Sequence, residues 1–333
     1  MTSPTEPASL ARQRIVDYDS GFDYCAFWGN RDYEQWVEAR TLRRLLPRLR
    51  KVDWFADFGG GYGRNAIHYQ GVAEHVILLD YSVTQLTRAA ERLAPEIQAG
   101  RVHLIRADLG RLPLIDSAVD AAIVVRVLHH LGDVDRCLTE MARAVAGRWL
   151  VDVPIKHHIL GRVRGIAQGR FREIADPQPV VSGSTEYPFW TFQLRAIRSC
   201  LLRAGFRTQI VASVNNLRRW DQVLPHGAVA PLRPVAYVIE LAAQRMGRGW
   251  WGPSQFLLAA RNSPQGRDLR EAPNGFSDSL AGLARRLQCP SCRSSLRWSA
   301  REAVCSCCQR SYPRREAFWD FAPDSAAPAP EVP

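Results

Sequence analysis

A glycine-rich loop directly after an apolar run constrains the fold of this chain most. The run Trp54–Phe58 leads into Gly59-Gly60-Gly61-Tyr62-Gly63. Glycine lets the backbone turn sharply and approach a bound molecule closely, so a strand that feeds such a loop is typical of nucleotide-binding α/β domains. Asp80 ends the next apolar run, 17 residues past Gly63, where a carboxylate can accept both hydroxyl groups of a ribose.

Apolar runs and helical patterns alternate on both sides of this loop. The segments between the runs have helical periodicity, as in residues 83–93 and 133–145, and further helices are expected at 65–70 and 194–204. This alternation predicts α/β architecture with a doubly wound, mostly parallel sheet. The expected strands are residues 54–58, 75–79, 102–105, 121–127, 149–153, 208–214 and, as the last strand, 255–260.

Composition changes along the chain predict its domain boundaries. The α/β domain is expected at 51–262, and its residues 156–204 mix glycine, arginine and aromatics as a substrate-side insertion would. A tail rich in proline and alanine is expected to be disordered. The full division is a helical cap at 1–50, the α/β domain, a polar linker at 263–287, a cysteine-rich module at 288–322 and the tail at 323–333.

The glycine spacing disfavours a nicotinamide-dependent dehydrogenase. Such enzymes carry G-x-G-x-x-G. This chain has G-x-G-x-G, with Arg64 at the position of the last dehydrogenase glycine. Nor does the sequence downstream of the loop contain an obvious set of residues for hydride transfer.

Four acidic residues and a Leu-His pair accompany the glycine loop in a fixed order. They are Asp57 before Gly59, Gly61 and Gly63; Asp80 after the second strand; Asp108 after the third; and Asp120 leading an apolar run into Leu128-His129. In this respect the chain resembles the class I S-adenosylmethionine (SAM)-dependent methyltransferases, in particular the group that includes ubiquinone and menaquinone biosynthesis enzymes. The resemblance covers about residues 15–262 and is loose after Pro154. It implies a Rossmann-like methyltransferase fold.

The resemblance also implies SAM as methyl donor and assigns residues to it. Alignment of the acceptor atom with the S–CH₃ bond would supply much of the catalysis. The expected contacts are Asp57, Gly59, Gly61 and Gly63 on the methionine part, Asp80 and Tyr81 at the ribose, Asp108 and Leu109 at the adenine, and Arg126 on the methionine and acceptor side.

A catalytic base is needed if the acceptor is a phenol or an acidic carbon. His129 and His130 are the candidates, because histidine titrates near neutral pH. The alternative is that one of the pair packs in the core or caps a helix. Both interpretations stay open from sequence.

Four cysteines near the C-terminus have metal-ligand spacing. Cys289, Cys292, Cys305 and Cys308 form C-x₂-C-x₁₂-C-x₂-C, and four thiolates on two short turns suit tetrahedral zinc. About 35 residues bury little core, so a structural Zn²⁺ would supply folding free energy. Cys307 is a spare that either packs or competes with Cys305 or Cys308 as ligand, and a disulfide requires an oxidising compartment.

This module resembles the small activator subunit of tRNA and translation-factor methyltransferases. The resemblance runs from Leu287 through Cys308 and includes Arg310–Pro313 and Phe318–Phe321. In that family the module binds a methyltransferase and covers its apolar surface. Fused in cis, it is expected to stabilise the enzyme or to present substrate, with zinc in a structural role.

The positive charge is concentrated in the middle of the chain. The net charge is +11, and residues 156–220 alone carry 11 basic and three acidic side chains. This segment could follow an RNA backbone, which keeps an RNA or protein methyltransferase open as the alternative function. A preference for arginine over lysine has a second explanation in a GC-rich genome.

We expect a small-molecule acceptor, with the O, N or C atom of a metabolite, quinone-type or lipid-like compound as target. Val125–Leu128 stands where amide-nitrogen and many base methyltransferases carry an Asn-Pro-Pro-Tyr type motif. A catalytically silent scaffold is a third hypothesis, disfavoured by the intact Asp57, Asp80 and Asp108. With no apolar stretch near the start and no membrane span in sequence, we expect a cytoplasmic enzyme whose oligomeric state is left open.

Overall fold

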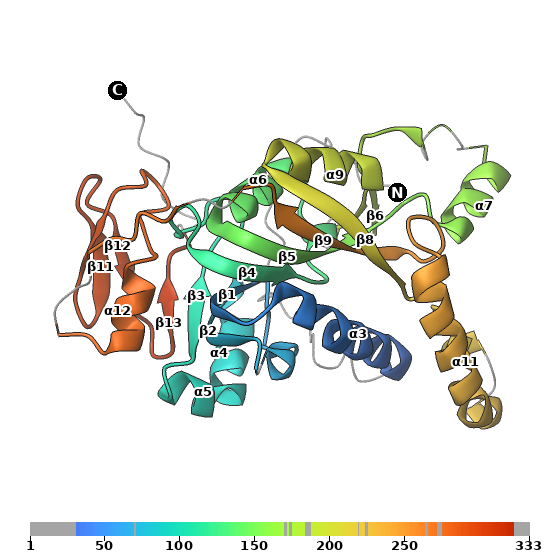
Figure 1. Ribbon diagram of the computed structural model, residues 1–333, viewed down its shortest axis with the longest axis horizontal. Coiled ribbons are helices and arrows are strands. Elements are labelled where there is room, and N and C mark those ends of the chain that lie inside the picture. Colours follow the sequence, from blue (N-terminus) through green and yellow to red (C-terminus); the bar gives the residue numbers. More distant parts are fainter. Residues whose placement is uncertain are drawn as a thin grey trace, which may run out of the picture.

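An eight-stranded, mostly parallel sheet forms the centre of the computed structural model (Figure 1). The structure describes residues 31–322 apart from 70, 170, 171, 173, 174, 184–187, 219, 224, 225, 264, 265 and 272–274. The strand order is β13-β3-β2-β1-β4-β5-β9-β8, and only β9 runs antiparallel to its neighbours. The expected doubly wound α/β fold is confirmed. The strands are β1 (Val52–Phe58), β2 (Ala73–Asp80), β3 (Val102–Arg106), β4 (Val119–Val124), β5 (Val145–Pro154), β8 (Phe206–Val214), β9 (Ser254–Arg261) and β13 (Phe318–Asp320).

Helices cover both faces of this sheet and divide the core into two clusters. Successive residues of a strand point to opposite faces, so Phe55 belongs to one cluster while Ala56 and Phe58 belong to the other. The helices of the sheet layers are α3 (Asp32–Leu45), α4 (Val83–Arg92), α5 (Ala94–Gln98), α6 (Val134–Ala144), α9 (Leu194–Arg203), α11 (His226–Met246) and α12 (Asp278–Ala284). Short helical turns are η1 (Leu46–Leu49), η2 (Ala66–His68), η3 (Leu128–His130) and α10 (Trp220–Val223).

Helix α4 shows how local sequence sets these elements. The Ser82 hydroxyl caps it by accepting a hydrogen bond from the Gln85 N–H at 3.1 Å, which satisfies one of the free donors of a helix start. Leu86 and Ala89 lie one turn apart and are fully buried against the sheet. Because α4 starts right after β2, this cap also fixes where Asp80 ends its strand.

The segment after β5 forms a separate layer outside the central sheet. It contains α7 (Ile159–Ala167) and a hairpin of β6 (Val180–Gly183) and β7 (Pro188–Thr191). β7 packs against η3, since Phe189 stacks on His129 with ring centroids 4.5 Å apart. This is the segment in which a substrate-side insertion was expected, and its assignment as such stays a prediction.

The cysteine-rich module continues the central sheet. Its own three-stranded sheet consists of β10 (Leu296–Trp298), β11 (Glu302–Cys305) and β12 (Ser311–Pro313). The following strand β13 then pairs in parallel with β3, with Trp319 opposite Ile105. Trp319 and Phe321 join the same core cluster as Ala56 and Phe58 of β1. The module is thus tied to the α/β domain by the pairing of β13 with β3 (Figure 1) and by a shared core.

Several elements differ from the sequence expectation. Only the 3-10 turn Ala66–His68 forms where a helix was expected at 65–70, and β13, not 255–260, is the last strand. α12 lies inside the segment expected to be a linker and buries Leu283 and Ala284. α11 was not predicted, because Pro231 and Pro234 interrupt its pattern. Residues 1–30 of the expected cap and the tail 323–333 lie outside the described residues. Among the described residues, no helix is long and apolar enough to cross a membrane.

Candidate functional site

A cavity of about 490 Å³ opens at the carboxyl ends of the parallel strands. Loops that follow β1, β2, β3 and β4 all contribute to it, as expected for a ligand site in an open α/β sheet. The structure brings eight of the nine residues expected at the cofactor together in its wall: Asp57, Gly59, Gly61, Asp80, Tyr81, Asp108, Leu109 and Arg126. Gly63 is the ninth and does not line the cavity.

The glycine loop has the backbone that its sequence predicts. Gly59 and Gly63 have φ angles of 74° and 73°, a region that favours glycine. A Cβ atom on Gly59 would lie 2.4 Å from a methyl group of Val127, and one on Gly63 would lie 2.7 Å from Leu93. Gly63 therefore allows the loop to pack on the end of α4, while Gly59 lets it pass the loop after β4.

Asp80 is held in a fixed orientation at the end of β2. One carboxylate oxygen accepts the Gly61 N–H at 2.8 Å, and the other accepts the Ser82 N–H at 3.0 Å. A carboxylate oxygen can accept more than one hydrogen bond. This geometry can hold the two hydroxyl groups of a ribose while it also braces the glycine loop.

Asp57 lies beneath the loop and is almost completely buried. It accepts a hydrogen bond from the Tyr69 hydroxyl. Burial raises the pKa of Asp57 to about 7, because a low-dielectric environment disfavours the charged form. A cationic group placed next to this carboxyl would favour its ionised form.

Asp108 and its neighbours form the wall after β3. The Gly110 N–H donates to Asp108 at 2.7 Å, and Arg136 lies 3.9 Å from its second oxygen. Ala107 and Leu109 flank it with apolar surface, and the Cys137 thiol also lines this part. An apolar slot with one acceptor suits a planar base that carries an amino group.

Arg126 connects the cavity to α3 through a buried charge network. Its backbone has a φ of 60°, and its guanidinium donates to Glu34 at 3.0 Å and to Glu38 at 3.2 Å. Glu38 also pairs with Arg64. Burial alone would raise the pKa of Glu38, but Arg64 and Arg126 outweigh it and hold that pKa below its usual value. The ion pairs of Arg126 therefore link helix α3 to the wall of the cavity.

Sequence reasoning missed Glu34 and Glu38. They stand four residues apart on one helix face, a spacing at which two carboxylates repel. Both are buried, at 4% and 2% exposure. Two acids at this spacing on one helix face favour a cation between them. This spacing was the signal that the sequence offered for the pair. Arg64 and Asn65 also line the cavity, and neither was predicted to do so.

The two candidate histidines occupy different positions. His130 lines the cavity, whereas His129 packs behind it against Phe189. Burial lowers the pKa of His130 to about 3, and burial together with His130 lowers that of His129 well below its usual value. Both imidazoles are therefore neutral at physiological pH. A pKa this low makes a neutral imidazole a weak base, and of the two histidines only His130 lines the cavity.

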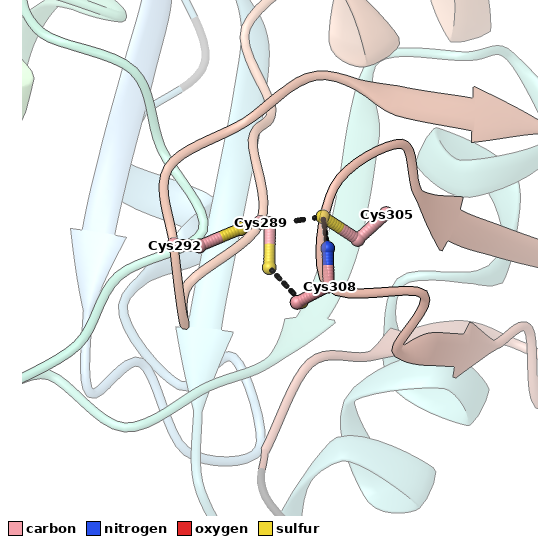
Figure 2. Close-up of side chains that lie close together, drawn as sticks. All are labelled: Cys289, Cys292, Cys305 and Cys308. Carbon is pink, nitrogen blue, oxygen red and sulfur yellow. Dashed lines mark hydrogen bonds between the residues drawn. The ribbon is translucent and has the colours of Figure 1, made fainter. Parts of the chain in front are cut away.

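The four expected metal-ligand cysteines converge on one point (Figure 2). Their sulfur atoms all lie within 4.8 Å of one another, with Cys289 and Cys308 3.6 Å apart and Cys292 and Cys305 3.3 Å apart. Thiolates around tetrahedral zinc lie about 3.8 Å apart, from Zn–S distances of about 2.3 Å. The donor set and spacing therefore fit Zn²⁺. Cys307 is exposed and lies outside this group.

Hydrogen bonds to the sulfurs support this arrangement. The N–H groups of Cys307 and Cys308 each point at Cys305 Sγ from 3.4 Å, and the Tyr312 hydroxyl lies 3.0 Å from Cys289 Sγ. Donors of this kind stabilise thiolates and orient metal ligands. With four sulfurs converging, such a metal would have no open position for substrate.

The cavity and the strand order agree with a comparison of the sequence with known families. Residues 56–147 match the profile of the family described as a methyltransferase domain. This part of the chain is similar to a methyltransferase domain. The matched segment begins in β1 before the glycine loop and ends in β5, so it contains all the loops that form the cavity.

Several proteins that are similar to this chain are named methyltransferases. A probable SAM-dependent methyltransferase of Mycobacterium tuberculosis is 32% identical over 169 residues, which are 50% of this chain and 53% of that protein. The chain thus spans about half the length of this relative. An O-methyltransferase of Aspergillus nomiae is 25% identical over 51% of this chain and 78% of its own length. A solved SAM-dependent methyltransferase of Thermotoga maritima aligns with a TM-score of 0.47 and 17% identity, over 72% of this chain and 95% of its own.

Proposed function

We propose that this protein binds SAM in the cavity and transfers its methyl group to a small-molecule acceptor. The observation that carries the proposal is the convergence of Asp57, Asp80 and Asp108 with the glycine loop on one 490 Å³ cavity. These three carboxyls come from three different strand ends, and a silent scaffold has no need of all of them. The methyltransferase family match over the same residues supports the assignment.

The residues fit the three parts of the ligand. SAM supplies a sulfonium-bound methyl group that is already electrophilic. Asp80 would accept the ribose hydroxyls, and Asp108 with Leu109 would hold the adenine. Asp57 and the glycine loop would receive the methionine part, whose ammonium favours an ionised Asp57. The work left to the protein is to align the acceptor, which can lower the barrier by several kcal/mol.

The acceptor side of the cavity is bounded by Arg126, His130 and the layer that contains β7. His130 is the candidate base, since it alone of the histidine pair lines the cavity. The Aspergillus relative is named an O-methyltransferase, which favours an oxygen acceptor such as a phenol or quinol. An acceptor of the quinone or lipid-like class fits the methyltransferase group that the motifs resemble.

The cysteine module would hold one structural Zn²⁺ through Cys289, Cys292, Cys305 and Cys308. Metal binding would fix the two turns from which β12 and β13 emerge. A zinc-stabilised module could then keep β13 on the edge of the sheet, in agreement with its resemblance to methyltransferase activator subunits. This role is stabilising and leaves the chemistry to the cavity.

An RNA or protein substrate is the second candidate. It is favoured by Arg162 and Arg164, which are exposed on α7 within the basic segment 156–220. Against it, aliphatic side chains alternate with these arginines on α7. Aliphatic side chains add nothing to a groove that binds a phosphate backbone.

The test is methyl transfer from radiolabelled SAM by the full-length protein. Acceptors would be offered in three pools: phenols and quinols with lipids, total RNA, and proteins. The proposal predicts label in the small-molecule pool. Label only in RNA or protein would establish the second candidate. SAM binding without label in any pool would support a scaffold.

A further inference from the structure

The end of the molecule away from the cysteine module exposes many apolar side chains. It consists of α7, α11 and the tryptophan pair Trp250-Trp251, which follows α11 (Figure 1). We call this set the apolar end. Its exposed apolar side chains are Leu160, Val163 and Ile166 on α7, Leu232, Val235, Val238, Ile239 and Met246 on α11, and Trp250 and Trp251. Patches of this kind on a protein surface mark interaction sites.

Helix α11 turns its polar side chains inward. Glu240 and Gln244 are fully buried. Glu240 accepts the Tyr33 hydroxyl at 2.6 Å and the Asn216 N–H at 2.9 Å, while Gln244 accepts from Arg44 at 2.8 Å. These contacts fix the rotation of the helix, so its aliphatic residues must face outward. The polar side chains on the inner face of α11 all have hydrogen-bond partners named above. Rotation of the helix to bury its apolar face would break these hydrogen bonds.

Helix α7 and the tryptophan pair are joined to this face. The Ile159 N–H at the start of α7 points to the Trp251 carbonyl at 3.4 Å. The rings of Trp250 and Trp251 meet edge to face, with centroids 5.2 Å apart, and both remain more than a third exposed. Tryptophan has an apolar body and a polar N–H, and is enriched where apolar and aqueous phases meet.

The charges on the apolar end are positive. Of the described residues of α7, the C-terminal half of α11 and the tryptophan turn, those with exposed charges are Arg162, Arg164, Arg245 and Arg248. Arg44 of α3 lies close to Arg245 and Arg248, and burial together with these cations lowers its pKa. Two carboxylates, Asp32 and Asp221, act on Tyr237 in the middle of α11. Arg44, Arg245 and Arg248 therefore form a positive cluster at the C-terminal end of α11, and such a cluster favours an anionic partner.

We propose that the apolar end docks on the surface of an anionic phospholipid bilayer. Aliphatic residues and tryptophans beside arginines are the features of interfacial membrane binding, in which apolar groups enter the headgroup boundary while cations meet lipid phosphates. A second copy of the chain fits less well, because a shared face would bring the same arginines together. RNA leaves the aliphatic face without a partner.

Docking through this end would bring the acceptor side of the cavity towards the bilayer. The chain runs from α7 into the β6–β7 hairpin, whose Phe189 stacks on His129 beside the cavity. This last step rests on the proposed function and favours a membrane-dissolved acceptor. The docking itself does not depend on methyl transfer.

The experiment is flotation of the full-length protein with vesicles. Vesicles of phosphatidylcholine alone would be compared with vesicles that also contain phosphatidylglycerol, at low and high salt. The variant Val235→Glu/Val238→Glu places two carboxylates at positions that are 56% and 67% exposed. Leu202→Glu, on α9 and 58% exposed, is the matched control. Trp250→Ala is a second variant, and circular dichroism and light scattering check fold and size.

The proposal predicts flotation with anionic vesicles, loss of flotation at high salt, and a partition coefficient at least about tenfold lower in the double variant. Trp250→Ala would weaken binding and Leu202→Glu would leave it unchanged. Absence of flotation, equal flotation with neutral vesicles, or an equal loss in Leu202→Glu would overturn it. So would a dimer that dissociates in the double variant, which would make this face a self-association surface. S-adenosylhomocysteine binding, measured separately, reports on the cavity alone.

Discussion

Asp320 on β13 accepts two hydrogen bonds from the guanidinium of Arg106 on β3, at 3.2 and 3.3 Å, across 214 positions in the sequence. The same guanidinium donates to the carbonyl of Tyr81 at 2.9 Å. Tyr81 lines the cavity next to Asp80. One arginine thus contacts both the cysteine module and the wall of the proposed cofactor site.

Asp320→Ala should lower the free energy of unfolding by about 3 kcal/mol, because it leaves a largely buried guanidinium without its partner. The two side chains are 4% and 15% exposed. Denaturant unfolding monitored by fluorescence measures the change. Asp116→Ala removes an ion pair to Arg143 in which the carboxylate is 73% exposed, so it should cost less than about 1 kcal/mol. Equal effects of the two substitutions would show that β13 is not held by this pair.

Cys305→Ser should abolish zinc binding and lower the Tm by at least about 5 °C, since structural zinc supplies folding free energy. Cys307→Ser is the matched control, one exposed thiol in the same turn that lies outside the sulfur group. It should keep one zinc per chain and the Tm of the unchanged protein. Metal analysis and calorimetry measure both. If the purified protein contains no zinc and Cys305→Ser leaves its Tm unchanged, the structural metal would be refuted.

The ends of the strands could be predicted from the sequence, whereas long-range partners could not. Asp57, Asp80 and Asp108 each follow an apolar run, and parallel strands bring such ends to one edge of a sheet. β13 has only three residues, too short for a periodicity, and its place depends on pairing with β3. The contact of Arg126 with Glu34 is likewise set by packing between segments 92 positions apart. The outward apolar face of α11 depends on the buried partners of Glu240, which no local pattern reveals.

The affinity for S-adenosylhomocysteine should rise about tenfold between pH 6 and pH 8 if the ammonium of the ligand meets an ionised Asp57. Burial raises the pKa of Asp57 to about 7, so the carboxyl loses its proton in this window. For the unliganded protein the sign is opposite. The folded state holds more protons than the unfolded state between about pH 4 and pH 7, so Asp57 lowers the free energy of unfolding as the pH rises.

Asp57→Asn should remove the rise in affinity, while Asp53→Asn, an exposed aspartate at the other end of β1, should keep it. Titrations at several pH values with both variants measure the difference. The same pH slope in Asp57→Asn and in the unchanged protein would assign the effect to another group.

Asp80→Ala should weaken S-adenosylhomocysteine binding about a hundredfold, because two hydroxyl groups lose a charged acceptor. It also removes the brace on Gly61, so loop order is lost together with the ribose contact. Asp80→Asn keeps one acceptor oxygen and should lose less. Calorimetric titration measures the affinities, and circular dichroism checks the fold. An affinity in Asp80→Ala equal to that of the unchanged protein would contradict the ribose assignment.

Calorimetric titration of the full-length protein with S-adenosylhomocysteine tests the central claim most directly. The cavity at the ends of β1, β2, β3 and β4 predicts one site per chain with a dissociation constant in the micromolar range or tighter. The same titration with NAD serves as the contrast, since the glycine spacing disfavours that ligand. Binding of S-adenosylhomocysteine and not of NAD is the result that the account predicts. If titration of the folded, zinc-loaded protein with S-adenosylhomocysteine gave no heat of binding, that result would contradict the account.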